Sequence, residues 1–346
     1  MTAGLRALFI TLILAAVAWT VREIPGFGYL PLVDDDVNIF FNPHLGAPGA
    51  STLLWMATDS SYVHRYMPLG WLGFSVVFSL SGLDPAGYHL AGLAFHALNA
   101  VLLFFILEQL LLRFAAAVPV RDRIVGAGLA SLLWALHPLR VETTAWCSGL
   151  LYAQAGFFAL AFVWARLAEL RARSEGRNRN GAWYFVAGWA SFAASVLTYP
   201  VALFLPFAVA IVDHAWTGAD SEAERRSRRA VRLEMVALGL TSLGALLLTA
   251  HARGTVVTSW GRTPTLAEFG ILSRALQASY VASMYLWRTF WPVDVNWLPR
   301  TLFDAEIPGG VGWIALATIA LVTGAALKFW KRAPVFAACW VSYLIL

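Results

Sequence analysis

The sequence predicts an all-α polytopic membrane protein, and three features of its composition lead to that fold class. Hydrophobic residues make up 59% of the 346 residues and charged residues only 13%, whereas about a quarter of a soluble domain is charged. A chain with so little charge cannot cover the surface of a soluble globule, but it can face lipid. The 16 tryptophans also fit, because tryptophan is enriched at membrane–water interfaces.

The net charge of +5 does not indicate a nucleic-acid partner, because the basic residues form short clusters between apolar segments. Cys147 and Cys339 lie inside apolar stretches, which excludes a disulfide framework and zinc-binding spacing. The first apolar segment, 5–21, lacks a clean small-residue cleavage site and runs directly into Arg22 and Glu23. We therefore interpret it as a retained first span and not as a signal peptide.

About nine apolar segments are predicted to cross the membrane. They are 5–21, 86–112, 125–138, 146–170, 183–197, 199–215, 234–251, 311–329 and 333–346. Several are shorter than the ~20 residues that a straight span needs. Pro138 and Pro200 interrupt two pairs of short segments, and such breaks are tolerated where the backbone is buried in protein or lines a cavity.

The basic residues predict the orientation. With alternating spans every basic cluster falls on one side, which the positive-inside rule assigns to the cytoplasm. We therefore expect a cytoplasmic N-terminus, a first outer loop at 22–85, an outer turn at 137–145 and a second outer region at 252–310. The clusters are Arg6; Arg113, Arg121 and Arg123; Arg171, Arg173, Arg177 and Arg179; Arg225, Arg226, Arg228, Arg229 and Arg232; and Lys328, Lys331 and Arg332.

Two further apolar segments are predicted to lie along the outer interface. Residues 267–291 are apolar enough to span, but spanning would place the last basic cluster outside, and Arg274 and Arg288 interrupt the segment. An amphipathic interfacial helix fits better, and residues 67–82 have a similar pattern. We expect one transmembrane domain over 1–346. Because the last predicted span is only about fourteen residues long, we also expect a native C-terminal part beyond this sequence.

The first outer loop carries three adjacent carboxylates, Asp34, Asp35 and Asp36, which form the strongest candidate site. Neighbouring carboxylates repel one another and lose solvation near a membrane. Such a cluster binds a cation, or holds one carboxyl at a raised pKa for proton transfer. A divalent cation such as Mg or Mn at Asp34 and Asp36 is the corresponding metal site. The alternative is a solvated acidic turn without chemistry.

A second candidate lies at the first proline break, on the same predicted outer side. It contains His137, Arg140 and Glu142, and ionisable groups at such a break in a membrane protein are site candidates. The alternative, which this motif alone favours, is that Arg140 anchors the chain at the interface and His137 makes an ordinary hydrogen bond.

Other polar residues within the spans have simpler interpretations. His89 and His96 are seven residues apart and share a helix face. We expect them to pack or to hydrogen-bond to a neighbouring span rather than to form a bis-histidine cofactor site. Glu108 and Asp213 lie near the cytoplasmic ends of their predicted spans, where we expect them to pair with arginines.

Several short motifs follow one another along nearly the whole chain. They are Asp34–Ile39 with Asn42–Leu45, Arg65–Leu72, Gly87–Leu90 with His96–Leu103, Leu136–Trp146, Leu203–Pro206 and Phe290–Pro292. Each is weak alone, but the ordered set is specific. In this order they resemble bacterial relatives of the transmembrane-and-tetratricopeptide-repeat (TMTC-like) glycosyltransferases, which are polyprenyl-phosphate-sugar-dependent membrane enzymes of the GT-C fold.

The resemblance implies a reaction and a location. A lipid-linked sugar, such as mannose on a polyprenyl phosphate, is bound at the outer interface and transferred with inversion to a hydroxyl of a protein or glycan. One of Asp34–Asp36 acts as general base or holds a divalent cation, with Glu142 in the same cavity. The expected location is the bacterial inner membrane, with the site on the periplasmic side. The implied substrate-binding residues are His44, Arg65, Tyr66, His137 and Arg140.

The chain departs from these relatives at two positions that are basic there. A charged stretch after Trp146 is replaced by Gly-Leu-Leu-Tyr at 149–152, and the lysine of a Ser-Lys-Pro-like turn is replaced by Tyr199. A departing lipid phosphate needs a cation, because its negative charge grows as the sugar leaves. Arg65 and Arg140 are the candidate substitutes.

Two further function classes stay open beside the enzyme. A catalytically degenerate relative would serve as a structural or accessory subunit of a larger membrane protein complex. A transporter or channel is less favoured, because the predicted spans lack charged residues at mid-depth.

Overall fold

The computed structural model of the chain is all-helical, and the residues that it describes form thirteen α-helices and no strand. The described residues are 2–31, 34–216, 222–254, 267, 269–293, 310–330, 332 and 334–345. Only the backbone is described for 212–216, 222–232, 253–254 and 334. Asp213, the Arg225–Arg232 cluster and Lys331 therefore lie outside the described side chains.

By its contacts the chain divides into two compact units. Unit 1 consists of Met1–Pro206 and Trp216–Val256, and unit 2 of Phe207–Ala215 and Val257–Leu346. The expected single transmembrane domain over 1–346 stays a prediction.

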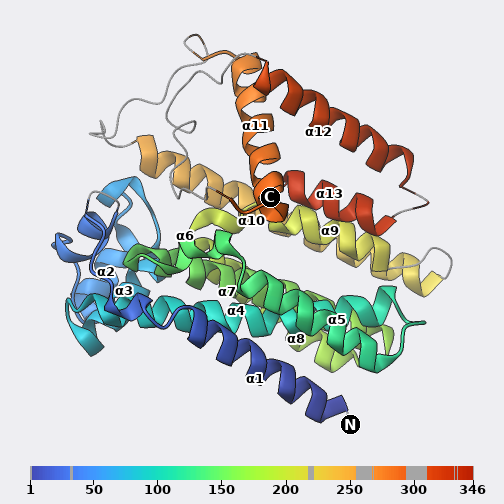
Figure 1. Cartoon of the computed structure of the whole chain (residues 1–346), viewed down its shortest axis with the longest axis horizontal. Helices are drawn as coiled ribbons and strands as arrows, with labels where there is room; N and C mark the ends of the chain where they lie inside the picture. Colours follow the sequence, from blue (N-terminus) through green and yellow to red (C-terminus); the bar gives the residue numbers. More distant parts are fainter. Residues whose placement is uncertain are drawn as a thin grey trace. The chain divides into compact units, whose positions relative to one another are not determined.

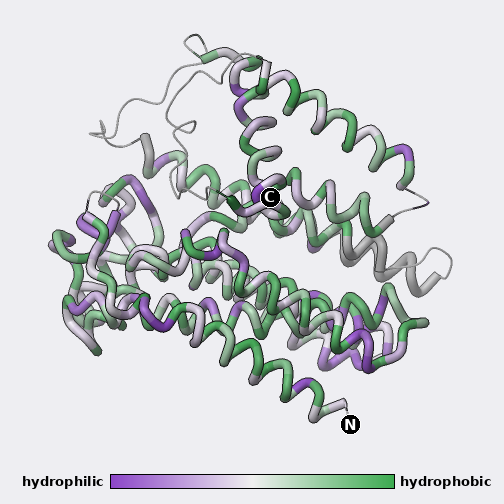
Figure 2. The backbone as a smooth tube through the Cα atoms, viewed as in Figure 1, coloured by the Kyte–Doolittle hydropathy of each residue, from purple (hydrophilic) through white to green (hydrophobic). Residues whose placement is uncertain are grey.

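Unit 1 contains five helices that lie side by side (Figure 1). They are α1 (Thr2–Thr20), α4 (Pro85–Phe114), α5 (Val120–Ala135), α7 (Leu150–Ser174) and α8 (Asn178–Thr198). α7 packs against α8 and α4, and α5 packs against α4 and α1. Figure 2 shows that apolar residues occupy the middle of these helices and that hydrophilic residues gather toward their ends.

Shorter elements of unit 1 surround the predicted site. They are η2 (Asp36–Phe40), α2 (Ala50–Thr58), η3 (Tyr62–His64), α3 (Pro68–Ser81), η4 (Pro138–Arg140), α6 (Val141–Thr144), η5 (Cys147–Gly149) and η6 (Pro200–Ala202). The long helix α10 (Glu222–Gly254) contacts η3 and η6.

Two prolines end their helices, as the sequence predicts. The residue before a proline is driven out of the helical region, and Tyr199, with φ −162° and ψ 136°, is extended where α8 stops. His137 has ψ 132° and begins the break after α5. The chain bends by 56° at the first break and by 117° at the second. The first bend leads through η4 and α6 into η5, and the second contains η6.

Five described helices are long and apolar enough to cross a membrane, or up to seven if each bent pair counts as one span. This is compatible with an integral membrane protein. The predicted count of nine is not reached, because α9 (Leu205–Trp216) and α13 (Pro334–Ile345) have only 12 residues each, and a straight span needs ~20. The nine spans and the GT-C fold stay predictions.

Unit 2 is built from α11 (Ile271–Phe290), α12 (Val311–Lys328), α13 and part of α9. α12 packs against both α11 and α13. The hydroxyl of Tyr343 donates to the carbonyl of Ala282 at 2.6 Å, which ties α13 to α11. The predicted helices at 267–291 and 67–82 therefore exist as α11 and α3, while their place at an outer interface stays a prediction.

Three separate basic segments of unit 1 meet at one end of the bundle. Arg6, Arg123 and Arg171 line the same cavity, although they come from α1, α5 and α7. Arg6 Nε also donates to Glu108 Oε1 at 2.8 Å, which confirms the expected pairing of Glu108. The positive-inside interpretation requires this convergence, but the orientation itself stays a prediction.

The two buried histidines of α4 make contacts with different neighbours. His96 Nε2 lies 3.0 Å from the carbonyl oxygen of Ala135 in α5. His89 Nε2 lies 3.4 Å from the sulfur of Cys147 in η5. The prediction that these residues pack or hydrogen-bond to neighbouring segments is confirmed.

Candidate functional site

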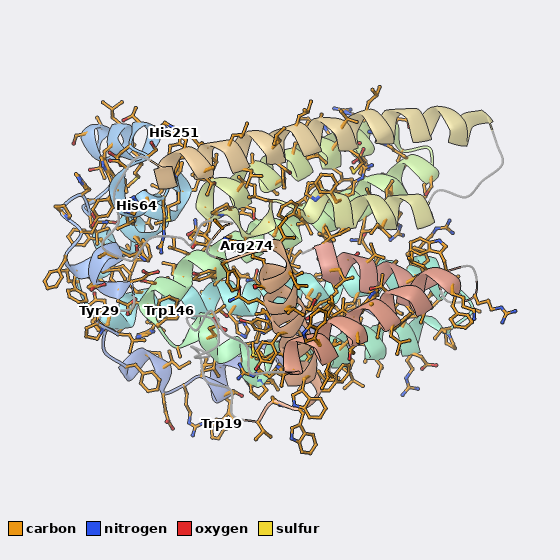
Figure 3. All side chains as sticks on the ribbon, turned by 90° about the horizontal axis from the view of Figure 1, so that it is seen from above. Trp19, Tyr29, His64, Trp146, His251 and Arg274 are labelled. Atoms are coloured by element: carbon orange, nitrogen blue, oxygen red, sulfur yellow. The ribbon has the colours of Figure 1, made fainter. Side chains whose placement is uncertain are left out.

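The acidic run lies at the end of unit 1 that carries α2, α3 and η5. Figure 3 shows Tyr29, His64 and Trp146, labelled, toward this end. Asp34 has a left-handed backbone, with φ 69°, which aspartate tolerates better than most residues. Residues 34–36 therefore leave the extended path, and their three side chains enter different surroundings.

Asp35 is fully buried, and both of its carboxylate oxygens are occupied. Oδ1 accepts a hydrogen bond of 2.7 Å from the amide of Ser148, and Oδ2 accepts one of 2.9 Å from the amide of Leu30. The side chain of Asn38 donates to Ser148 Oγ at 3.2 Å. Asp35 thus holds the first loop against η5, and a substrate proton has no access to it in this structure.

Asp34 forms an ion pair with Arg65. Arg65 Nη2 lies 3.0 Å from Asp34 Oδ2, and the two side chains are 28% and 20% exposed. The guanidinium also lies over the ring of Tyr199, 5.8 Å from its centre. Burial lowers the pKa of Arg65, but Tyr199 and Asp34 outweigh that effect and raise the pKa overall. Arg65 is therefore a fixed cation that remains partly accessible.

Tyr199 belongs to an aromatic row that leads to Arg65. Its ring lies 5.0 Å from that of Tyr152, which stacks on Trp146 at 6.1 Å. Tyr199 and the stretch 149–152, which ends at Tyr152, are the two places where the sequence departs from the family it resembles. Arg65 lies beside both tyrosines, so this region carries a cation.

Asp36 is the most available carboxylate of the three. It is partly exposed, and its Oδ1 accepts from the amide of Val37 at 2.9 Å. Its Oδ2 has no hydrogen bond or ion pair with any residue that the structure describes. The hydroxyl of Tyr62 donates to the carbonyl of Val37 at 2.7 Å. Burial, and then the Asp36 carboxylate, raises the pKa of Tyr62 to about 12.

His44 and Tyr66, two predicted substrate-binding residues, are held by local contacts. The His44 ring stacks on Trp55, with 4.4 Å between ring centres and 13° between planes. Its backbone amide donates to Asn42 Oδ1 at 2.9 Å. The Tyr66 hydroxyl donates to the carbonyl of Ala57 at 3.0 Å, which fastens the loop to α2. The structure thus gives both residues a role in shaping the loop.

The second candidate segment, which contains His137, Arg140 and Glu142, is linked to the acidic run by backbone contacts. His137 Nδ1 accepts a hydrogen bond of 3.2 Å from the amide two residues later and so caps η4. The Arg140 guanidinium lies 5.2 Å from the ring centre of Trp134. Glu142 is exposed on α6. Because α6 leads directly into η5, the segment joins the acidic run through Ser148, the partner of Asp35.

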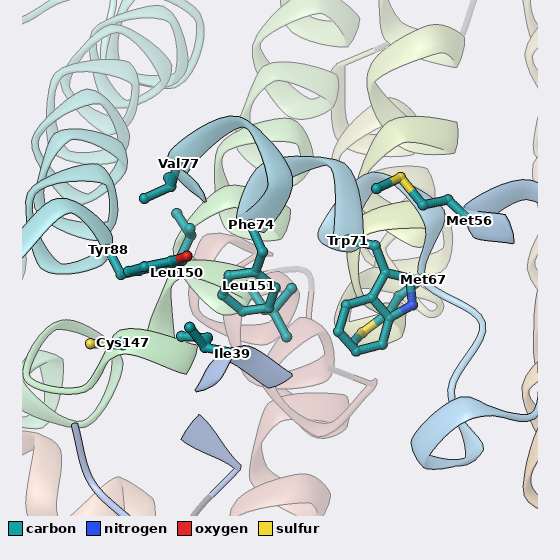
Figure 4. Packing of buried hydrophobic residues seen from close by; sticks show 10 residues of the cluster. All are labelled: Ile39, Met56, Met67, Trp71, Phe74, Val77, Tyr88, Cys147, Leu150 and Leu151. Carbon is teal, nitrogen blue, oxygen red and sulfur yellow. The ribbon is translucent and has the colours of Figure 1, made fainter. Parts of the chain in front are cut away.

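A buried apolar cluster packs the first loop against α3, α4, η5 and α7 (Figure 4). Its members are Ile39, Met56, Met67, Trp71, Phe74, Val77, Tyr88, Cys147, Leu150 and Leu151. Each large side chain buried there contributes about 1.5–3 kcal/mol. Leu151 is 1% exposed, so an arginine at this position would be a buried charge. The cluster fixes the loop and explains why this position is apolar.

The described residues contain no group of three or more histidine, cysteine, aspartate or glutamate side chains able to hold a metal ion. Asp34 is engaged by Arg65, and Asp35 by two backbone amides. The side chains present therefore do not form a Mg or Mn site by themselves. The cation at Asp34 and Asp36 stays a prediction, and no step below depends on it.

Sequence reasoning missed two residues of this arrangement. Ser148 binds Asp35 through its backbone amide, 113 residues further along the chain. A backbone contact of this kind leaves no pattern in the side chains. Tyr62 lies beside Asp36 and carries no motif. Its place between two turns rich in polar residues was the only available signal.

Comparisons with known proteins give a partial similarity. No model of a known protein family matches the chain, and no solved structure matches it. Protein O-mannosyl-transferase Tmtc3 of Drosophila melanogaster is 34% identical over 117 residues, which are 31% of this chain and 12% of that protein. The chain thus covers a small part of that relative. The similarity supports relatedness to TMTC-like glycosyltransferases, and it does not support the expected bacterial relatives.

Proposed function

We propose that the chain is a membrane glycosyltransferase that moves a sugar from a polyprenyl-phosphate donor to a hydroxyl group of a protein or glycan. The partial similarity to an O-mannosyltransferase and the apolar helices support the enzyme class. The observation that carries the proposal is the ion pair of Asp34 and Arg65 beside Tyr199. The pair supplies a fixed cation, and Asp36, two residues after Asp34 in the sequence, supplies a carboxylate with an available oxygen. Sugar transfer from a phosphate uses one group of each kind.

Arg65 binds the donor phosphate in this proposal. Its guanidinium presents several N–H donors in a planar fork that matches phosphate oxygens. When the bond between the anomeric carbon and the phosphate oxygen breaks, the electron pair stays on the phosphate. A fixed cation stabilises that growing charge without reorganising. Asp34 and the Tyr199 ring hold the guanidinium in place from two sides.

Asp36 is the general base. Its Oδ2 accepts the proton of the acceptor hydroxyl while the hydroxyl oxygen forms the new bond to the anomeric carbon. Attack on the face opposite the departing phosphate inverts the configuration, as in inverting glycosidases. Asp35 keeps the loop in register, and Glu142 lies on the adjoining α6, where it faces solvent.

The proposed site faces the non-cytoplasmic side of the membrane. The basic segments of α1, α5 and α7 meet at the opposite end of the bundle from the acidic run. The positive-inside rule places that basic end, and with it the N-terminus, in the cytoplasm. A polyprenyl-phosphate sugar and an acceptor would meet at the other end.

Turnover of a labelled mannosyl-phosphoryl-polyprenol by the purified protein in detergent, with hydroxyl-bearing peptides as acceptors, tests the proposal. We expect Asp36→Asn to lower turnover ~10²–10⁴-fold and Arg65→Gln to lower it ~10²–10³-fold. Glu23→Gln and Arg22→Gln are matched controls, because this pair is exposed and Arg22 donates only to neighbours in sequence, the carbonyl of Trp19 and the Glu23 side chain. Wild-type rates in both site variants would overturn the assignment.

The accessory-subunit alternative predicts a different outcome. Wild-type protein would then turn over no polyprenyl-phosphate sugar and would co-purify stoichiometrically with partner proteins in mild detergent. The geometry and the comparisons do not favour this alternative.

A further inference from the structure

A basic cavity of about 460 Å³ lies at the end of the unit 1 bundle far from the acidic run. Side chains from α1, α4, α5, α7 and α8 line it. Its charged lining residues are Arg6, Glu108, Arg123, Arg171 and Arg177. Four arginines therefore face one carboxylate across the cavity, and the wall attracts anions.

Most of these arginines already have a carboxylate partner. Arg6 donates to Glu108, and Arg171 and Arg177 share Glu175 at the exposed rim. These pairs fix the positions of the guanidinium groups. All three side chains line the cavity, and two carboxylates do not neutralise three guanidinium groups.

Arg123 is the exception. It is only 8% exposed, and its guanidinium has no hydrogen bond or ion pair with any residue that the structure describes. Arg123 also lines the cavity, and a largely buried charge is favourable only when an opposite charge or hydrogen-bond acceptors lie beside it. The position of Arg123 in the first turn of α5 adds to the cost, because a helix N-terminus carries a partial positive charge. An anion in the cavity would remove this penalty.

The rest of the wall indicates what carries that anion. Phe105, Leu112 and Trp164 supply apolar surface next to the arginines, and Tyr184 adds a hydroxyl. An anionic group attached to an apolar chain would pair with the arginines and pack against the apolar side chains of this cavity. Basic pockets between transmembrane helices at the cytoplasmic face bind phosphate head groups of anionic lipids.

We propose that this cavity binds a phosphate group and that an anionic membrane lipid supplies it. The site is distinct from the proposed donor site. Glu108, in the cavity wall, is 19 residues along α4 from His89, which contacts η5 beside the acidic run. At 1.5 Å per residue this corresponds to about 30 Å along the helix.

Binding of phosphatidylglycerol, phosphatidylcholine and inorganic phosphate to the purified detergent-solubilised protein tests the proposal, with thermal unfolding and native mass spectrometry as readouts. We expect phosphatidylglycerol to bind and to raise the unfolding temperature. Inorganic phosphate should compete with it only weakly, and phosphatidylcholine should not compete. Binding of inorganic phosphate without phosphatidylglycerol would retain the phosphate site but overturn the lipid as its source.

Two variants and one control separate this site from general surface charge. We expect Arg123→Gln to weaken phosphatidylglycerol binding ~10-fold or more, since a charge-assisted hydrogen bond is lost. Arg177→Gln removes an exposed wall residue that does not threaten the fold and should weaken binding less. Arg179→Gln changes the net charge equally but lies outside the cavity. Equal affinity in all three would overturn the proposal.

Discussion

Asp35 in the first loop accepts a 2.7 Å hydrogen bond from the backbone amide of Ser148, 113 residues further along the chain. The bond joins the acidic run to the turn that follows the first proline break. The three neighbouring aspartates therefore differ in exposure: Asp35 is fully buried, while Asp34 and Asp36 remain partly exposed.

Loss of the Asp35 carboxylate should destabilise the fold. Asp35→Ala leaves the amides of Ser148 and Leu30 buried without acceptors, and each unpaired group costs about 1–3 kcal/mol. We expect the free energy of unfolding to fall by about 2–4 kcal/mol, measured by tryptophan fluorescence in detergent. Asp36→Ala is the matched control and should change it by less than about 1 kcal/mol. Equal effects of the two variants would contradict the anchoring role.

A buried ionic cluster should make Arg166 critical for stability. Its Nη1 lies 2.7 Å from Glu169 Oε2 and 2.7 Å from Glu234 Oε1, and its side chain is 2% exposed. Removing one partner of a buried pair costs about 3–5 kcal/mol, because the remaining charge loses its partner. We expect Arg166→Met to lower the unfolding temperature strongly. Arg171→Met, in an exposed pair on the same helix, should leave it nearly unchanged.

Two glycines of α5 should respond to alanine with opposite signs. A Cβ at Gly128 would overlap the ring of Phe9 from α1, whereas a Cβ at Gly126 meets only Leu111 Cδ1 at 3.9 Å. Overpacking costs about 1–3 kcal/mol, while alanine is about 0.5–1 kcal/mol better than glycine within a helix. Gly128→Ala should therefore destabilise and Gly126→Ala stabilise. Unfolding temperatures of the two variants that shift in the same direction would contradict the close packing of α1 on α5.

Tyr62 should titrate about two pH units above an ordinary tyrosine, because its pKa is raised from 10.0 to about 12. The folded state favours the neutral phenol, so its contribution to stability is complete below pH 10 and is lost as the pH rises toward 12. The ultraviolet absorbance difference between wild type and Tyr62→Phe isolates this one titration. A midpoint near 10 would show that the phenol is not buried beside Asp36.

The helices follow from the sequence because long apolar runs and prolines act locally. The predicted span 86–112 corresponds to α4 at Pro85–Phe114, and the break at Pro200 follows α8 directly. The number of membrane crossings does not follow, since helices such as α9 are too short to decide it, and the short helix α2 was not predicted.

The site was predictable as a region but not residue by residue. Topology places Asp34–Asp36 together, yet their burial depends on Ser148 and Tyr62, which are remote in sequence or carry no motif. The stacking of His44, a predicted substrate contact, on Trp55 could not be predicted either. Side-chain environments of this kind arise from long-range packing, which periodicity cannot encode.

The contact of Arg65 with Tyr199 has a consequence for how the charge of the site is inferred from the sequence. In the sequence alone, apolar or aromatic residues such as Leu151 and Tyr199 stand where the family that the chain resembles carries basic ones, and this would argue for an inactive chain. Yet Arg65, from another segment, lies over the Tyr199 ring. A positive charge therefore reaches this site from a different segment of the chain, and the charge of the site follows from positions in space and not from single sequence positions.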